Sequence, residues 1–196
     1  MRIRDEQKEA LVKEKAIELL VEYGFEGFSM QKLAREVGIS PATLYIYYSD
    51  KEDLIKKLGL ELGEKFCTKM LSDFNGKMSL REGLKKQWEN RSKYMLENPM
   101  EVNAFEVIRH SPAGLEVMQA TTAQFGPVMA EFAHNAIANK ELRPMPLEVY
   151  WSITYGPLYT LLKFHLDGRS IAAKPFVFTE EIMYETLELV LKALKP

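Results

Sequence analysis

Cysteine, histidine and long apolar runs are scarce in this chain of 196 residues. The single cysteine, Cys67, excludes a disulfide within the chain and a zinc site made of several cysteines. No segment approaches the ~20 uninterrupted apolar residues that span a bilayer, so no membrane span is expected. The first residues, MRIRDEQKEALVKEKA, are charged throughout and contain no apolar core of a secretion signal. We therefore expect a cytoplasmic protein.

Motifs for catalysis are absent as well. His110, His134 and His165 are far apart in the sequence and form no HxxxH or HExxH pair. The sequence has no glycine-rich phosphate loop and no nucleophile elbow. Its carboxylates are spread over the predicted helix faces, as solvated charges usually are. We expect no enzyme activity, no cofactor and no bound metal.

The sequence does contain helical signals along almost its whole length. Apolar residues recur at helical spacing, with capping residues before them and Gly or Pro after them, and no strand pattern appears. Ser49 to Glu52 and Ser79 to Glu82 have the spacing of capping boxes. One predicted helix opens at Ser29 and one at Ser40, and the others cover about residues 5–23, 50–74, 79–98, 100–110, 112–125, 127–141, 147–166 and 179–194. This layout predicts an all-α fold in which Gly126-Pro127 separates two helices.

Residues 29–54, SMQKLAREVGISPATLYIYYSDKEDL, form the most informative segment. Ala34 is followed four positions later by Gly38, a pattern that lets two helices pack nearly at right angles through a short connection. Ser40 can then cap the next helix, and Pro41 fits its first turn. The apolar contacts between the two helices are expected from Leu33, Val37, Ile39 and Leu44. The second helix is small and polar at its start and aromatic at its end, which suits the major groove of DNA.

The longer sequence GFEGFSMQKLAREVGISPATLYIYYSDKEDL resembles the N-terminal DNA-binding segment of the TetR family of transcriptional regulators. The resemblance runs from about Lys8 to Leu58, and later residues are similar to the family only in helical layout. The matching features are Gly24-Phe25, Phe28-Ser29, Ala34, Gly38, Ser40, Leu44-Tyr45, Tyr47-Tyr48, Lys51 and Leu54. The resemblance implies a three-helix helix-turn-helix DNA-binding domain and a larger helical ligand-binding and dimerisation domain. We place these at residues 1–49 and 50–196.

The resemblance also implies which residues meet DNA. It places residues 40–43 at the groove-facing start of the recognition helix, Tyr45 and Ile46 against bases or sugar, and Tyr47 and Lys51 against phosphate. Thr43 can hydrogen-bond a base edge or touch a thymine methyl, and Lys51 is a point charge at a helix start. Tyr48 is expected in the core. The predicted DNA-binding residues are Ser29, Ser40, Pro41, Ala42, Thr43, Tyr45, Ile46, Tyr47 and Lys51.

The formal net charge of −2 is less basic than is usual for a DNA-binding protein. Most of the acidic residues within residues 1–58 lie on the first predicted helix, whose outer face can point away from DNA. The helix starts near Ser29 and Ser40 offer backbone N–H groups and positive dipole ends to phosphates. We therefore expect modest affinity for each monomer and reliance on dimerisation.

The last predicted helix supports a homodimer. It carries more large apolar residues than the core of one monomer should need: Ile182, Met183, Leu187, Val190, Leu191 and Leu194. Together with residues 147–166 it would build a four-helix interface. A two-fold dimer would place its recognition helices about one DNA turn, ~34–36 Å, apart.

Residues 50–196 are rich in aromatic side chains and methionine, which line adaptable apolar cavities well. Ordinary packing in a core or a dimer interface would also account for them. Because members of the TetR family commonly hold an effector among these helices, the resemblance implies a pocket for a small apolar or amphipathic effector. The predicted contacts are Trp88, Phe105, Phe125, Met129, Trp151 and Tyr155. Candidates for its polar groups are Gln87, Arg91, Asn103, Arg109, His110, Gln124 and His165.

The sequence as a whole predicts a ligand-responsive transcriptional repressor that binds a palindromic double-stranded DNA operator as a dimer. One alternative is a helical ligand carrier or scaffold in which the helix-turn-helix is only a packing motif. Another is an activator or a constitutive DNA-binding module without an effector. Specific, salt-sensitive duplex binding would separate the repressor from the carrier, and weakening of that binding by a ligand would separate it from the effector-independent regulator.

Overall fold

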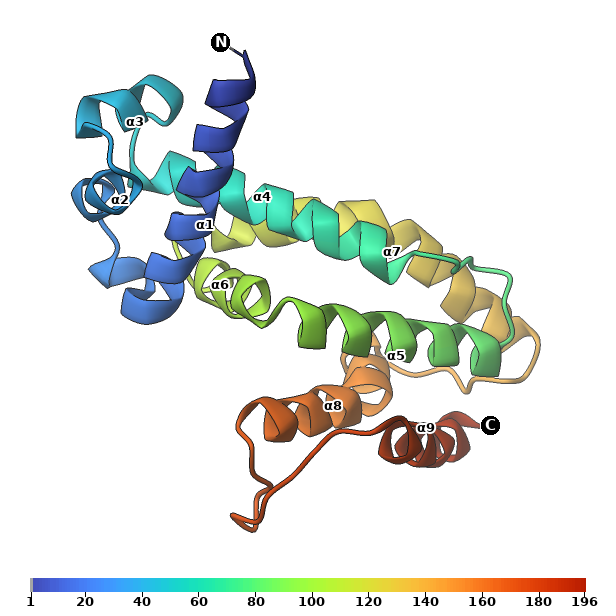
Figure 1. Ribbon diagram of the computed structural model, residues 1–196. Coiled ribbons are helices and arrows are strands. Elements are labelled where there is room, and N and C mark those ends of the chain that lie inside the picture. The colour runs from blue at the N-terminus through green and yellow to red at the C-terminus, as the bar shows by residue number, and fades with distance from the viewer. Residues whose placement is uncertain (1) are drawn as a thin grey trace. The chain divides into compact units, whose positions relative to one another are not determined.

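The computed structural model describes residues 2–196, with side chains from Gln7 onward. Over these residues the backbone forms nine helices, and its only strand-like pairing is an isolated bridge between Arg169 and Pro175. The helices are α1 Arg2–Gly27, α2 Met30–Val37, α3 Pro41–Tyr47, α4 Lys51–Met70, α5 Leu80–Glu97, α6 Pro99–Arg109, α7 Gly114–Ala138, α8 Leu147–Leu166 and α9 Glu180–Leu194 (Figure 1). This confirms the predicted all-α fold. None of the described helices is long and apolar enough to cross a membrane.

Capping residues set several helix boundaries where the sequence predicted them. Gly24 has φ 66° and breaks the helical path of α1 near its end. At the start of α5 the Ser79 hydroxyl donates to Glu82 Oε2 (2.7 Å), while the Glu82 N–H donates to Ser79 Oγ (3.3 Å). At the start of α9 the Thr179 hydroxyl oxygen accepts the N–H of Ile182 (3.3 Å). The predicted cap at Ser79 is confirmed, and Thr179 caps α9.

The cap of α4 lies one residue later than the sequence predicted. Asp50 rather than Ser49 accepts the first free N–H, that of Asp53, at 2.8 Å. The Asp53 carboxylate in turn accepts the N–H of Ser49 at 3.0 Å. Aspartate caps a helix as well as serine does. The sequence therefore contains two overlapping capping boxes, Ser49–Glu52 and Asp50–Asp53, and the second one forms.

The predicted break at Gly126-Pro127 is wrong, because α7 runs continuously over Gly114–Ala138. Pro127 removes one N–H donor, which frees the carbonyl of Ala123 four residues earlier. Ala123 and Pro127 are both exposed, so water can bond to that carbonyl. A proline in the middle of a helix is tolerated more easily near solvent than in a core.

The chain divides into two compact units. Helices α4 and α7 each contribute residues to both units. Unit 1 comprises Met1–Phe66 and Asn98–Gln124, and unit 2 comprises Cys67–Glu97 and Phe125–Pro196. Unit 1 thus extends beyond residue 49, because the first part of α4, α6 and the start of α7 help to enclose its core. The functional division at residues 49 and 50 stays a prediction.

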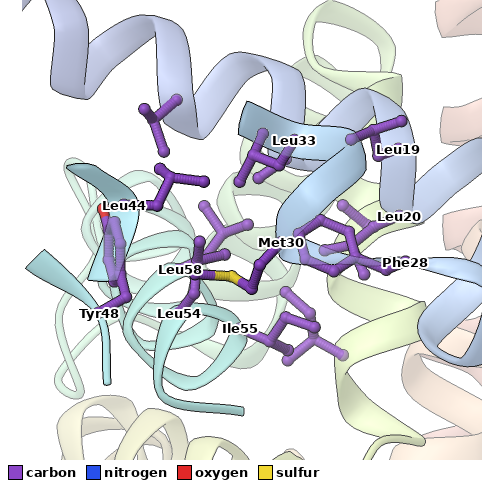
Figure 2. Packing of buried hydrophobic residues seen from close by; sticks show 14 of the residues in the cluster. Leu19, Leu20, Phe28, Met30, Leu33, Leu44, Tyr48, Leu54, Ile55 and Leu58 are labelled. Atoms are coloured by element: carbon purple, nitrogen blue, oxygen red, sulfur yellow. The ribbon is translucent and has the colours of Figure 1, made fainter. Parts of the chain in front are cut away.

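Unit 1 is built on a core made mainly of aliphatic side chains. Leu20, Leu33, Leu44 and Ile55 are fully buried in it, one from each of the first four helices (Figure 2). Tyr48 is buried at its edge, as expected from the sequence. Full burial of each leucine contributes about 1.5–3 kcal/mol, so α2 and α3 are held in place by several such side chains together.

Two glycines allow α4 to approach its neighbours closely within unit 1. A Cβ atom at Gly59 would lie only 2.8 Å from Ile108 Cγ2 and 2.9 Å from Val117 Cγ2. A Cβ atom at Gly63, one turn further along α4, would overlap the hydroxyl of Thr121. Glycine at these positions therefore brings the backbone of α4 against α7.

Unit 2 has a more aromatic core, and α9 packs into it. Trp88, Phe132 and Tyr155 are fully buried. Most of the apolar residues of α9 that the sequence assigned to a dimer interface lie inside this core: Met183, Leu187, Val190, Leu191 and Leu194. The core of a single monomer absorbs these five side chains, so they do not by themselves indicate an interface, whereas Leu189 of α9 is 61% exposed. The dimer stays a prediction.

Candidate DNA interface

The turn between α2 and α3 is fixed by caps on both sides. Ser29 caps α2, since its hydroxyl oxygen accepts the N–H of Lys32 at 3.2 Å. Gly38 ends α2 in the left-handed conformation, with φ 74° and ψ 32°, which a residue without Cβ adopts at no steric cost. The N–H of Ile39 then donates to the carbonyl of Ala34 at 2.9 Å. These bonds give the short connection that a helix-turn-helix requires.

Ser40 and Thr43 form a hydrogen-bonded pair at the start of α3. The Ser40 hydroxyl oxygen accepts the N–H of Thr43 at 3.2 Å, and the two hydroxyl oxygens are 2.9 Å apart. Pro41 and Ala42 are exposed beside them, and Thr43 is half-buried. The first turn of α3 therefore presents small side chains and a hydroxyl group whose position is fixed.

The two faces of α3 differ sharply. Leu44 is fully buried and anchors the helix, whereas Tyr45, Ile46 and Tyr47 expose 51%, 77% and 57% of their surface. These three large side chains are therefore mostly outside the core, so packing within the monomer does not account for them. Such a face is what a helix needs in order to enter a groove of DNA.

Aromatic rings hold two lysines near the helix-turn-helix. Lys51 Nζ lies 3.9 Å from the centre of the Phe25 ring, and Lys32 Nζ lies 3.9 Å from the centre of the Tyr23 ring. The sequence predicts Lys51 as a phosphate contact, but it does not reveal the role of Phe25 and Tyr23. The Gly24 turn between them is visible in the sequence, yet nothing in their spacing indicates that they point toward lysines of other helices.

Lys57 is a further residue that the sequence does not single out, and it fixes the end of α3. Its ammonium group donates to the carbonyl of Tyr47 at 3.1 Å and to Asp53 Oδ2 at 2.9 Å. A cation at this position complements the negative end of the α3 dipole. The bond from Lys57, together with the N–H of Ser49, lowers the pKa of Asp53 below its ordinary value.

The inner side of α3 borders a cleft of about 620 Å³ against α1 and α4. Thr43 and Tyr47 line it together with Lys13, whose ammonium group pairs with Glu9 at 3.0 Å and with Glu61 at 2.6 Å. Thr43 and Tyr47 thus lie at the border between this cleft and the exposed face. Tyr45 and Ile46 lie on the open side alone.

The residues predicted to bind an effector do not all belong to the same compact unit. Phe105 is in unit 1 and packs against its core. Trp88 and Tyr155 are fully buried in unit 2, Phe125 and Met129 are half-buried there, and Trp151 is 38% exposed. Of the candidate polar groups, Gln87 and Arg91 are buried, and His165 is half-buried. The exposed candidates are Asn103, Arg109, His110 and Gln124.

A fixed helix-turn-helix with an exposed second helix, carried by an all-helical body, defines a helix-turn-helix regulator. Comparison with known proteins agrees. The sequence profile of the bacterial regulatory proteins of the tetR family matches residues 8–58. Residues 8–58 thus carry the DNA-binding segment of the TetR family of transcriptional regulators, which is a family of regulators rather than of enzymes.

Two curated relatives match part of the chain. An uncharacterised HTH-type transcriptional regulator from Haemophilus influenzae is 27% identical over 81 residues, which are 41% of this chain and 43% of that protein. The fatty acid metabolism regulator protein of Bacillus subtilis is 30% identical over 69 residues, which are 35% of this chain and 36% of that protein. The chain thus matches less than half the length of either relative.

A solved structure matches the whole chain. The TetR family transcription regulator from Marinobacter aquaeolei VT8 has a TM-score of 0.85 and 26% identity, and the match covers 100% of this chain and 99% of that one. The likeness therefore extends through the helices that follow the helix-turn-helix. It confirms the predicted architecture of an N-terminal DNA-binding part and a helical C-terminal part.

Proposed function

We propose that this protein is a repressor that binds a palindromic operator as a homodimer and releases it when a small apolar or amphipathic effector binds. The observation that carries the proposal is the exposed face of α3, where Tyr45 and Ile46 stand beside the fixed Ser40–Thr43 pair. Exposed aromatic and aliphatic side chains without a packing partner favour a binding role over a structural one.

In this proposal the DNA contacts are divided between bases and phosphates. Ala42, Thr43, Tyr45 and Ile46 meet base edges or sugars, and the methyl-bearing groups among them suit thymine. Ser29, Ser40, Pro41, Tyr47 and Lys51 lie along the backbone of the duplex. The position of Lys51 over the Phe25 ring supports its role, because a lysine held there loses less side-chain entropy on meeting a phosphate.

Support for the dimer comes from exposed apolar side chains on α8. Leu147 and Val149 expose apolar surface in the first turn of α8. Gly156, further along the helix, has no atom near the position that a Cβ would take. A second copy packed on this face would bury surface that one monomer leaves open, as an isologous interface does.

The effector is placed in unit 2, where Trp88, Met129, Trp151 and Tyr155 supply aromatic and thioether surface. For release of DNA, the effector must bind the DNA-incompetent state more tightly, by about 1–3 kcal/mol for typical coupling. Met129→Trp should fill space in this region, weaken effector binding and leave the protein on its operator. A variant that binds its operator normally and still responds to the effector would contradict the pocket.

Selection of bound duplexes from random DNA tests the DNA-binding part. The full-length protein should enrich an inverted repeat whose half-sites are about one helical turn apart, and it should sediment as a dimer at micromolar concentration. Thr43→Ala combined with Tyr45→Ala should lose this enrichment while it keeps its helicity and its dimeric state. Tyr184→Phe in unit 2 is the matched control. A stable monomer, or equal enrichment by the double variant, would contradict the proposal.

A further inference from the structure

Unit 2 encloses a positive charge in an aromatic setting. Arg91, on α5, is fully buried. Its Nη1 donates to the hydroxyl of Tyr159 at 2.5 Å, and its Nη2 donates to Gln87 Oε1 at 3.2 Å. Its Cζ lies 4.2 Å from the centre of the Tyr155 ring and 5.4 Å from that of Trp151. The guanidinium group thus contacts the side chains of Gln87, Tyr155 and Tyr159.

Three buried hydroxyl groups lie on the neighbouring helix α8. The hydroxyls of Tyr150, Thr154 and Tyr155 are shielded from water and have no hydrogen-bond partner of acceptable distance and angle. Thr154 and Tyr155 are fully buried, and Tyr150 is 7% exposed. Buried polar groups in proteins are nearly always satisfied, so unsatisfied hydroxyls in one cluster indicate an occupant that bonds to them.

The two tyrosine hydroxyls are protonated donors at neutral pH. Burial raises the pKa of Tyr150, and the nearby Tyr155 raises it further, while Thr154 and Arg91 lower it by less. Burial also raises the pKa of Tyr155, against an opposing effect of Arg91. Tyr150 is thus affected by Tyr155 and Thr154, and Tyr155 by Arg91. All of them can donate, and the guanidinium group cannot accept.

We propose that Arg91, Tyr150, Thr154 and Tyr155 bind the anionic oxygen head group of the effector, a carboxylate or a phosphate ester, whose apolar body lies against Trp151. A convergent set of donors around a buried cation matches an anion with several acceptor oxygens. It does not match a cation or a purely apolar molecule. This inference rests on the proposed function, because it names the chemical class of the proposed effector.

Trp151 gives the apolar body its place. Its ring lies 4.7 Å from that of Tyr155, centre to centre, and its exposed fraction is larger than that of Arg91, Tyr150, Thr154 or Tyr155. In the proposed site the head group lies at Arg91, and the chain attached to it contacts the indole ring. The effector expected from this geometry is an amphipathic organic anion.

Three probes with a decyl-length body separate the head groups while they keep the body constant. Decanoate, decyl phosphate and decanol should be titrated into the full-length protein, with calorimetry and thermal unfolding as readouts. Decanoate or decyl phosphate should bind at least about tenfold more tightly than decanol, because hydrogen bonds to charged groups are the stronger ones. The better of the two anions identifies the head group. Equal affinity for all three probes would overturn the inference.

Hydroxyl deletions test the residues themselves. Tyr155→Phe and Thr154→Val keep the shape of the side chains and should each reduce the preference for the anion over decanol severalfold. Tyr184→Phe is the matched control, because the Tyr184 hydroxyl bonds to Glu89 outside the cluster. If Tyr155→Phe and Thr154→Val raise the unfolding temperature and leave the anion preference unchanged, the hydroxyls hold only water and the inference is wrong.

Arg91→Met removes the charge while keeping much of the side-chain volume. It should bring decanoate binding down to the level of decanol and leave decanol binding as it was. Operator binding is measured in parallel, so the two proposals fail separately. Anion binding without operator release would contradict the ligand-responsive repressor and leave the anion site intact. Operator release by decanol, with no preference for an anion, would contradict the anion site alone.

Discussion

The two compact units are built from different kinds of core. Unit 1 buries mainly aliphatic side chains, and its buried polar residue, Thr121, donates its hydroxyl to the carbonyl of Val117 at 2.8 Å. Unit 2 buries large aromatic rings together with Gln87, Arg91, Ser92 and Thr154. In unit 2 several hydroxyls find no partner within the protein.

The two cores suit different tasks: the core of unit 1 holds α3 in position, and the core of unit 2 suits ligand binding. The aliphatic core of unit 1 has one function, to hold α3 in a fixed position, and it needs no polar group for that. A buried hydroxyl without a hydrogen-bond partner costs about 1–3 kcal/mol, so the unsatisfied hydroxyls of unit 2 favour a binding role. We expect the two units to respond differently to substitution.

The largest difference is expected in stability. Leu33→Ala removes a fully buried side chain of unit 1 and should destabilise the protein by about 2–5 kcal/mol, because it leaves a cavity. Tyr150→Phe in unit 2 removes a hydroxyl without a partner and should leave the unfolding free energy unchanged or slightly higher. Chemical denaturation of both variants measures this. A similar decrease for both would remove the distinction between the two cores.

The next effect concerns operator affinity. Thr43→Ala and Tyr45→Ala should each weaken operator binding by about 1–3 kcal/mol per site, doubled when both half-sites of a dimer are used. The same changes should leave the affinity for effector probes unchanged. Fluorescence anisotropy with the selected operator measures the first, and calorimetry the second. Unchanged operator affinity would mean that α3 is not the recognition helix.

Lys51→Ala should have a smaller and less selective effect. It should weaken binding to all duplexes alike and reduce the slope of log affinity against log salt by about 0.9 for each phosphate that Lys51 neutralises. Lys51→Arg, which keeps the charge over the Phe25 ring, is the control. A weakening confined to one DNA sequence would place Lys51 against a base instead.

The smallest effect belongs to the cap of α5. Hydrogen bonds from the Ser79 side chain and backbone N–H lower the pKa of Glu82 below its ordinary value of 4.5. The charged form therefore stabilises the fold above about pH 4.5, and this contribution is lost as the pH falls through the lower folded-state pKa. Glu82→Gln should flatten that part of the stability profile relative to the wild-type protein. Denaturant unfolding over a series of acidic pH values measures both profiles.

The helix-turn-helix could be predicted because its signals are local. Ser29, Gly38 and Ser40 each act on backbone groups within a few residues, so sequence alone indicates their roles. The continuity of α7 could not be predicted, since it depends on the solvent access of the Ala123 carbonyl beside Pro127. Phe25 over Lys51 could not be predicted either, because a ring contact between two helices leaves no periodic signal.

The polar cluster of unit 2 shows the same limit. Arg91 and Gln87 are two of many candidate polar residues, and no pattern in the sequence distinguishes them. Their selection follows from α5 and α8 packing together, which brings Arg91 to Tyr155 and Tyr159. The sequence places Phe105 with the aromatic residues of the effector site, whereas the structure places it in unit 1. Which helices meet cannot be read from their separate amphipathic patterns.

The glycines of α4 have a consequence for how the sequence can change over time. At Gly59 and Gly63 even one added carbon atom would meet Ile108, Val117 or the hydroxyl of Thr121. Descendant lineages should therefore keep these two positions as glycine, or change them only together with a smaller residue on the facing helix. Tyr45 and Ile46 carry no such constraint from packing. The recognition surface of α3 is free to diverge toward new operators while the glycines of α4, the next helix, are kept unchanged.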